Sequence, residues 1–433
     1  MRNRISTYAA VLALLFGLGT TSHLAAQTSA ANPSSYFVFN LGAPGGISAA
    51  AASINNIGWI AGDNFTSATT EHAELWLGIP FDLGTLGGPN SAVAWPNKNT
   101  RGQIVGISET ADLNTLGEAW SCALANFATI TNHICYGFLW QDGAMKALLP
   151  LPGGLNSYGA AINNRGQAVG WAENATHDST CVTPQVLQFE AVMWGPSPGQ
   201  ITELPPLSGD LDGAATAIND RGEVVGISGI CDQAVGRFTA QHAVLWENGR
   251  PINLGNFDNG VAWNTPTAIN NTGQVVGFAN LPNTSMGGFN PTGFFWSREH
   301  GIQKILPLGS DANSFAWGMN DRGQVVGDSC VDNTFSKCRA FVYQDGVATD
   351  LNTLIQPNSS LNLILANDVN DRGEIVGFAL DNIAGIVVAF LAVPVDGGNR
   401  EANNGIDLQS VLPDAIRRQM PGFGRFADNS GSR

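Results

Sequence analysis

Short runs of small and apolar residues, each closed by a polar turn, recur along this chain at intervals of about fifty residues. Each run leads into a version of the phrase Ile-Asn-Asp-Arg-Gly-Gln-Val-Val-Gly. The seven copies are Ile54–Gly62, Lys98–Gly106, Ile162–Gly170, Ile218–Gly226, Ile269–Gly277, Met319–Gly327 and Val369–Gly377. Repeats of this length are typical of solenoids, propellers and arrays. Residues repeated so often are expected to serve the scaffold, so we look for function where the copies differ.

The fourth copy shows how one repeat divides into strands. Ala214–Asn219 consists of small and apolar residues and predicts a strand, which ends in the turn Asn219–Gly222. Asparagine at the first position of such a turn bonds its own backbone, and glycine at the fourth position adopts the left-handed conformation of a bulged hairpin. Glu223–Gly226 opens the return strand, and His242–Trp246 and Pro251–Leu254 predict a third and a fourth strand.

The third strand is the second recurring element. Five of the eleven tryptophans stand at its last position, which indicates packing between neighbouring sheets rather than a row of ligand platforms. Its other copies are Ala73–Trp76, Gly137–Trp140, Ala191–Trp194, Gly293–Trp296, Ala340–Tyr343 and Val388–Ala392.

Four antiparallel strands in each of seven units predict an all-β fold, a seven-bladed β-propeller of four-stranded blades. A linear β-solenoid is the alternative architecture. The ends of the repeat region favour the ring, because a spare strand, Tyr36–Leu41, precedes the first unit and the last unit stops at its third strand, Ile386–Val393. Pairing these two strands would close the last blade with the N-terminal strand and leave no exposed sheet edge.

The two recurring elements resemble those of the HAF repeat, a family of bacterial extracellular proteins named for a His-Ala-Phe-like triplet. The triplet stands here as His72-Ala73-Glu74, His242-Ala243-Val244 and, in degraded form, Arg339-Ala340-Phe341. The similarity covers most of the chain, and the strand order is also kelch-like. The resemblance implies a secreted propeller-like protein, and it supplies no reaction and no catalytic residues.

Composition and the two ends set the broad class. Asp plus Glu number 35 against 20 Lys plus Arg, a net charge of −15, so this acidic protein is a poor candidate for nucleic-acid or anionic-membrane binding.

Residues 1–30 read as a signal peptide, with a retained anchor as the alternative, and residues 31–396 as the propeller. Residues 397–433 read as a mostly disordered tail with a short helix near 411–420. We expect a secreted or periplasmic monomer without a membrane span after cleavage.

The copies differ most in the connection between the second and third strands. The longest such insertion is Ile107–Cys135, in which Trp120 and His133 are candidate ligand-binding residues. All six cysteines lie in these connections and allow fifteen pairings. Topology favours three disulfides among them, Cys122–Cys135, Cys181–Cys231 and Cys330–Cys338, and export would keep them oxidised.

Carboxylates gather in the connections between blades. Asp210, Asp212, Asp258 and Asp311 are candidate ligands for a hard cation such as Ca²⁺, although aspartate is also an ordinary turn residue. No cofactor is called for, and no hydrolase or nucleotide-binding motif is present. The sequence therefore favours a non-catalytic module that binds an extracellular glycan or protein through the long loops of one face. The alternatives are a hydrolase or lyase that acts on extracellular polysaccharide through acidic residues of that face, and a structural cell-surface protein.

Overall fold

The computed structural model describes residues 35–118, 122, 127, 131–181, 183, 185–231, 240–257, 263–281, 290–333, 335 and 337–395. The predicted signal peptide, the C-terminal tail with its helix, Trp120 and Asp258 lie outside these residues. Within the described part of the chain, no helix has the length and apolar character needed to cross a bilayer.

The described strands follow one another in sets of four, as the repeat predicts. The first three sets are β2 (Ser48–Ile54), β3 (Ile60–Ser67), β4 (Thr70–Trp76) and β5 (Pro80–Asp82); β6 (Gly87–Ala92), β7 (Gln103–Leu113), β8 (His133–Gln141) and β9 (Ala144–Leu148); and β10 (Gly153–Ile162), β11 (Ala168–His177), β12 (Leu187–Trp194) and β13 (Ile201–Leu204). The next three are β14 (Asp212–Ile218), β15 (Val224–Gly229), β16 (His242–Glu247) and β17 (Arg250–Asn253); β18 (Asn264–Ile269), β19 (Val275–Asn280), β20 (Pro291–Ser297) and β21 (Gly301–Ile305); and β22 (Asn313–Met319), β23 (Val325–Cys330), β24 (Cys338–Gln344) and β25 (Val347–Asp350). The last is β26 (Leu361–Val369), β27 (Ile375–Asp381), β28 (Ile386–Pro394) and β1 (Tyr36–Gly42), and the short 3-10 helix η2 (Leu351–Thr353) precedes it.

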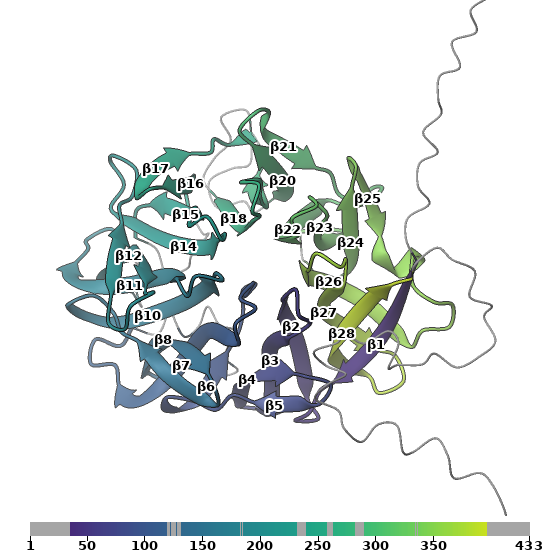
Figure 1. Ribbon diagram of the computed structural model, residues 1–433, viewed down its shortest axis with the longest axis horizontal. Coiled ribbons are helices and arrows are strands. Elements are labelled where there is room, and N and C mark those ends of the chain that lie inside the picture. Colours follow the sequence, from purple (N-terminus) through teal and green to yellow (C-terminus); the bar gives the residue numbers. More distant parts are fainter. Residues whose placement is uncertain are drawn as a thin grey trace, which may run out of the picture.

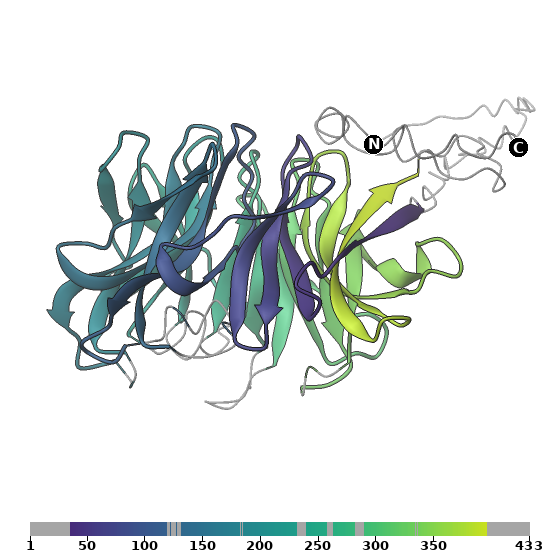
Figure 2. The same ribbon diagram turned by 90° about the horizontal axis from the view of Figure 1, so that it is seen from below.

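Five of these sets are separate four-stranded antiparallel sheets, and the first and last sets share an eight-stranded sheet through the single bridge Ser48–Val387. The sheets stand around a central axis, so the predicted all-β propeller is confirmed (Figure 1). Strand β1 pairs antiparallel with β28 from Tyr36–Pro394 onwards, as the spare N-terminal strand predicts. Both views show β1 beside β28 (Figures 1 and 2).

The core lies between neighbouring blades. One cluster joins Leu245 of β16 to Val275, Phe294 and Trp296 of the next blade, all of them buried. The indole N–H of Trp246 donates to the Pro205 carbonyl oxygen at 2.7 Å, in the connection that enters its own blade. This burial bears out the packing role predicted for the third-strand tryptophans.

The last glycine of the phrase allows the two inner strands of each blade to approach closely. A Cβ atom on Gly226 would lie 2.0 Å from the Ala214 carbonyl oxygen, a contact that no side chain tolerates. The pairing of β14 with β15 shifts at this point, between Ala215 and Ala217, as at a β-bulge.

Candidate functional site

The propeller has two ends of different character, which we define by its connections. The turn face carries the turns between the first and second and between the third and fourth strands of each blade. The loop face carries the connections between the second and third strands and those that lead from one blade to the next. Because successive antiparallel strands reverse direction, these two groups of connections lie at opposite ends of the strands.

On the turn face, each asparagine of the phrase shapes its own turn. Asn270 Oδ1 accepts the backbone N–H groups of Thr272 at 3.1 Å and Gln274 at 3.0 Å. The Gly273 N–H donates to the Asn270 carbonyl oxygen at 3.0 Å, and Gly273 has a φ of +81°. Positive φ is shared by the glycine of every copy, as the sequence predicts: Gly58, Gly102, Gly166, Gly222, Gly273, Gly323 and Gly373.

The same asparagines also join the blades in a closed ring, which the sequence alone did not reveal. The amide Nδ2 of each asparagine donates to the backbone carbonyl oxygen of the matching asparagine in the next blade, at 2.7 to 3.2 Å. The donors are, in order, Asn55, Asn99, Asn163, Asn219, Asn270, Asn320 and Asn370, and the last of them donates to Asn55. Because the seventh asparagine donates to the first, these seven bonds run once around the ring of blades.

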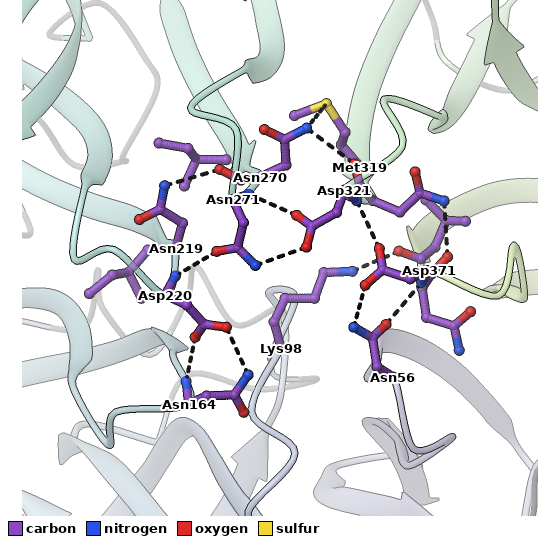
Figure 3. Close-up of a pocket in the computed structure, with 15 residues that line it drawn as sticks. Asn56, Lys98, Asn164, Asn219, Asp220, Asn270, Asn271, Met319, Asp321 and Asp371 are labelled. Carbon is purple, nitrogen blue, oxygen red and sulfur yellow. Dashed lines mark hydrogen bonds between the residues drawn. The ribbon is translucent and has the colours of Figure 1, made fainter.

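A second tier of polar residues surrounds a hollow at the centre of this face (Figure 3). The Asp321 carboxylate accepts both the backbone N–H of Asn271 at 2.7 Å and its side-chain amide at 2.9 Å. Asp220 is bonded in the same way by Asn164, and the Asp371 carboxylate accepts the Asp321 N–H at 2.8 Å. The hollow is therefore lined by groups that already bond one another.

One residue of this hollow breaks the repeat. Lys98 stands where the other copies have Ile, Met or Val, and its ammonium group forms an ion pair with Asp368 of the last blade. Lys98 Nζ also donates to the Val369 carbonyl oxygen at 2.8 Å, and the Ile54 N–H donates to Asp368 at 2.9 Å. The Asp368 side chain is fully buried, and this burial raises the pKa of its carboxyl despite the opposing effect of Lys98. The pair ties the second blade to the seventh.

On the loop face, two of the predicted cation ligands have partners within the chain. The Asp210 carboxylate lies 2.8 Å from His242 Nδ1. The Asp311 carboxylate lies 3.1 Å from the Arg339 guanidinium and accepts the Ser329 hydroxyl at 2.7 Å. In these two blades the first residue of the His-Ala-Phe-like triplet thus contacts the aspartate that precedes its blade, whereas His72 contacts Asp82 within its own blade.

The remaining predicted residues of this face are dispersed. Asp212 is buried and accepts the Phe189 N–H at 3.1 Å, and no metal-compatible group of side chains among the described residues contains Asp210, Asp212 or Asp311. His133 Nδ1 lies 2.7 Å from the Thr110 carbonyl oxygen, beside the long insertion. The predicted cation site and ligand-binding pair therefore gain no shared geometry from the fold and stay predictions.

The three disulfides are those that topology favours. Cys122–Cys135 closes the long insertion, Cys330–Cys338 closes the matching connection of the sixth blade, and Cys181–Cys231 joins the third and fourth blades. No cysteine of the chain is free. The loop face is thus cross-linked covalently, whereas the turn face is joined by hydrogen bonds.

Buried carboxyl groups on the loop-face side come in pairs. Asp63 and Glu71 are diagonal neighbours on β3 and β4, where burial, followed by the adjacent Asp63 charge, raises the pKa of Glu71 to about 10. Burial, and then the charge of Glu118, raises the pKa of Glu173 to about 7. Nothing in the repeat phrase points to these acids, because they lie in the positions that vary between copies.

Comparisons with known proteins define little beyond the fold. No family model matches the chain, and no curated protein matches it. The chain is similar to the β-propeller domain of the Trilobed protease from Pyrococcus furiosus, at 8% identity and a TM-score of 0.46, over 86% of this chain and 100% of that one. It is also similar to the acylaminoacyl peptidase of Pyrococcus horikoshii, at 10% identity and a TM-score of 0.43, over 84% of this chain and 54% of that one. A protein of unknown function from Dyadobacter fermentans is similar at 14% identity and a TM-score of 0.38, over 70% of this chain and 93% of that one. All three TM-scores lie below 0.5, so the fold assignment rests on the strand pairing of this chain.

Proposed function

We propose that this protein is an exported, non-catalytic binding module that contacts an extracellular protein or glycan through its loop face. The observation that carries the proposal is the placement of exposed apolar side chains. Of the twelve large apolar side chains exposed among the described residues, nine lie in or beside loop-face connections: Ile47, Leu113, Leu116, Leu149, Leu211, Ile230, Leu306, Val331 and Ile383. This excess of exposed apolar side chains on one face supports an interaction site there.

The construction of the two faces supports the same choice. Turn-face polar groups satisfy one another around the ring, so few of them remain for a partner. Loop-face connections differ in length and are held by disulfides, which reduces the entropy lost when a loop meets its ligand. A face of fixed but unequal loops is suited to recognise one partner rather than many.

The test compares apolar residues of equal exposure on the two faces. Leu113 on the loop face and Val347 on the turn face are each 61% exposed. The protein is screened against arrays of glycans and of secreted proteins, and each ligand found is titrated against Leu113→Ser, Ile383→Ser, Val347→Ser and Ile79→Ser. We expect the two loop-face variants to weaken binding by about tenfold or more and the two turn-face variants to leave it unchanged. Equal losses on both faces, or no ligand at all, would contradict the proposal.

A second candidate, a polysaccharide-acting hydrolase or lyase, is favoured by the Asp63–Glu71 pair. The raised pKa of Glu71 keeps it protonated at neutral pH, while burial raises the pKa of Asp63 only to about 6. One protonated and one ionised carboxyl are the two states that acid and base roles use. Release of reducing ends from a polysaccharide panel, lost in Glu71→Gln and Asp63→Asn but kept in the exposed Glu299→Gln, would establish this activity. Absence of release from every substrate would remove the candidate.

Export and family membership belong to the same proposal. The predicted signal peptide and the three disulfides support an extracytoplasmic location, since reducing compartments do not maintain such cross-links. Membership of the HAF-repeat family rests on the two recurring elements of the sequence. Mass spectrometry of the mature protein tests the location, because cleavage within residues 25–31 would confirm the signal peptide.

A further inference from the structure

Two of the three disulfides have a buried carboxyl group beside them. In the sixth blade, one carboxyl oxygen of Asp328 and the sulfur atoms of Cys330 and Cys338 all lie within 4.8 Å of one another. Asp328 Oδ2 is 3.1 Å from Cys330 Sγ, and Asp328 Oδ1 accepts the indole N–H of Trp317 at 2.6 Å. A disulfide sulfur carries no hydrogen, so a hydrogen between this sulfur and Oδ2 belongs to the carboxyl group. The contact therefore fits a protonated Asp328 whose O–H donates to Cys330 Sγ.

The surroundings of Asp328 keep this proton in place. Phe315 and Ala340 stand opposite it on the two neighbouring strands, β22 and β24, and both are apolar. Burial raises the pKa of Asp328 to about 7, against the opposing effect of the Trp317 indole. The carboxyl group is therefore largely protonated below neutral pH.

Charged side chains near this site do not supply a cation in place of the proton. Arg339 forms ion pairs with Asp311 and Asp350, at 3.1 and 3.3 Å. Asp332 and Lys337 are exposed in the loop that the disulfide closes. A proton is therefore the positive charge available at this carboxyl group, and a sulfur atom is within its reach.

The two sulfur atoms of this disulfide differ in access. Cys330 is 1% exposed, whereas Cys338 is half-buried at the start of β24. A thiolate from solution therefore reaches Cys338 Sγ, and Cys330 becomes the leaving group. A thiolate that leaves into buried, apolar surroundings is unfavourable unless it gains a proton as the bond breaks. Asp328 holds such a proton at hydrogen-bonding distance.

We propose that Cys330–Cys338 is a thiol-exchange site, opened by an external dithiol, at which Asp328 is the proton donor. In the first step, a thiolate of the dithiol attacks Cys338 Sγ and forms a mixed disulfide. The bond between the two cysteines breaks, its electron pair passes to Cys330 Sγ, and this sulfur takes the proton of Asp328 Oδ2. In the second step, the remaining thiolate of the dithiol attacks the dithiol's own sulfur in the mixed disulfide. The dithiol leaves as a cyclic disulfide, oxidised by two electrons, and water protonates both the Cys338 thiolate and the Asp328 carboxylate.

Exchange at this site releases one connection of the loop face. Phe335 stands inside the loop that the disulfide closes, and its ring packs edge-on against Phe315 with the ring centroids 5.8 Å apart. Without the disulfide, this packing is the weaker of the two restraints on the loop. The site is thus a reversible modification of the loop face, whichever ligand that face binds.

The disulfide of the second blade provides an internal control. Cys122 and Cys135 are 4% and 0% exposed, so neither sulfur is open to a thiolate from solution. Glu109, the carboxyl group beside them, accepts the Asn90 amide at 2.9 Å and the Thr131 hydroxyl. Its oxygens are engaged by these donors, and we expect this disulfide to exchange slowly.

Reduction of the folded full chain by dithiothreitol tests the proposal. Samples are alkylated at intervals, and peptide mass spectrometry gives the rate constant of each disulfide per thiolate present. At about pH 6 we expect Cys330–Cys338 to react about tenfold or more faster than Cys122–Cys135. Its rate constant should fall by about tenfold between about pH 6 and about pH 9, because Asp328 loses its proton as the pH rises through about 7.

Asp328→Asn keeps the size of the side chain and an acceptor for the Trp317 indole, but it has no acidic proton to give. We expect its disulfide to react about tenfold more slowly than that of the parent at about pH 6, with little change up to about pH 9. The matched control Glu109→Gln should keep the parent profile at Cys330–Cys338.

A rate constant of the parent protein that does not change with pH would overturn the proposal, and this result does not depend on the folding of any variant. A parent profile that persists in Asp328→Asn would also overturn it, because another group would then supply the proton. Equal rates for Cys330–Cys338 and Cys122–Cys135 would have the same consequence, since reduction would then follow unfolding of the whole chain.

Discussion

The turn face and the loop face of this propeller hold the same blades together in different ways. On the turn face, matching asparagines repeat one hydrogen bond seven times and close a circle. On the loop face, contacts differ from blade to blade and include disulfides, an aspartate with His242 and another with Arg339. The comparison shows that repetition serves assembly, whereas the positions free of it are available for specific contacts.

The turn face contains one exception, and removing it should have the largest effect. Lys98→Met leaves the fully buried Asp368 carboxylate without its cation, which should lower the free energy of unfolding by about 3–5 kcal/mol. The double variant with Asp368→Ala restores the residue types of other copies and should recover most of that loss. Urea unfolding measures both, and a loss below about 1 kcal/mol in the single variant would show that the pair is not needed.

The loop face should respond to pH in the direction opposite to ordinary acid denaturation. Burial raises the pKa of Glu173 to about 7 and of Asp212 to about 8, above the values of an unfolded chain. The folded protein therefore holds protons that the unfolded chain releases, so stability falls as pH rises from about 5 to 8. Each such group should lower the free energy of unfolding by up to about 1.4 kcal/mol for each unit that the pH rises. Urea unfolding in EDTA measures this change. Stability that stays constant or increases over this range would contradict the assigned environments.

A single member of the asparagine ring should matter less than the ion pair. Asn270→Ala removes the bonds of its side chain to Thr272 and Gln274 inside the turn and the 3.2 Å bond to the Asn320 carbonyl oxygen, so we expect the free energy of unfolding to fall by about 2 kcal/mol. Asn270→Asp keeps the acceptor oxygen and loses only the donor, and about half that loss is expected. The matched control is Asn382→Ala at an exposed loop-face turn, which should change stability by less than about 0.5 kcal/mol.

The smallest effect should come from the first residue of the triplet. His242 is 36% exposed in its side chain, and the Asp210 carboxylate that it contacts also accepts the Ser228 hydroxyl. His242→Gln retains a hydrogen-bond donor for the Asp210 carboxylate. Thermal unfolding should therefore show a change in the free energy of unfolding below about 1 kcal/mol. A loss as large as that of Asn270→Ala would mean that loop-face contacts are as important to assembly as the ring, and the comparison would fail.

The sequence by itself determined the repeated strands, the shape of the turns and the pairing of the cysteines. Most of these depend on nearby residues: Asn270 and Gly273 close a turn of four residues, and Cys330 and Cys338 close one connection. The Cys181–Cys231 pair joins two blades, and the sequence predicted it because the other four cysteines pair within their own connections. The spare strand Tyr36–Leu41 also predicted its own pairing, because an unpaired edge is unfavourable.

Only the tertiary structure decided which residues meet across blades. Lys98 and Asp368 are separated by 270 positions. Their contact depends on the angle and spacing between packed sheets, which arise from all the buried side chains together and not from any local pattern. For this reason the repeat phrase identified the scaffold, whereas the buried acids became visible only in the folded molecule.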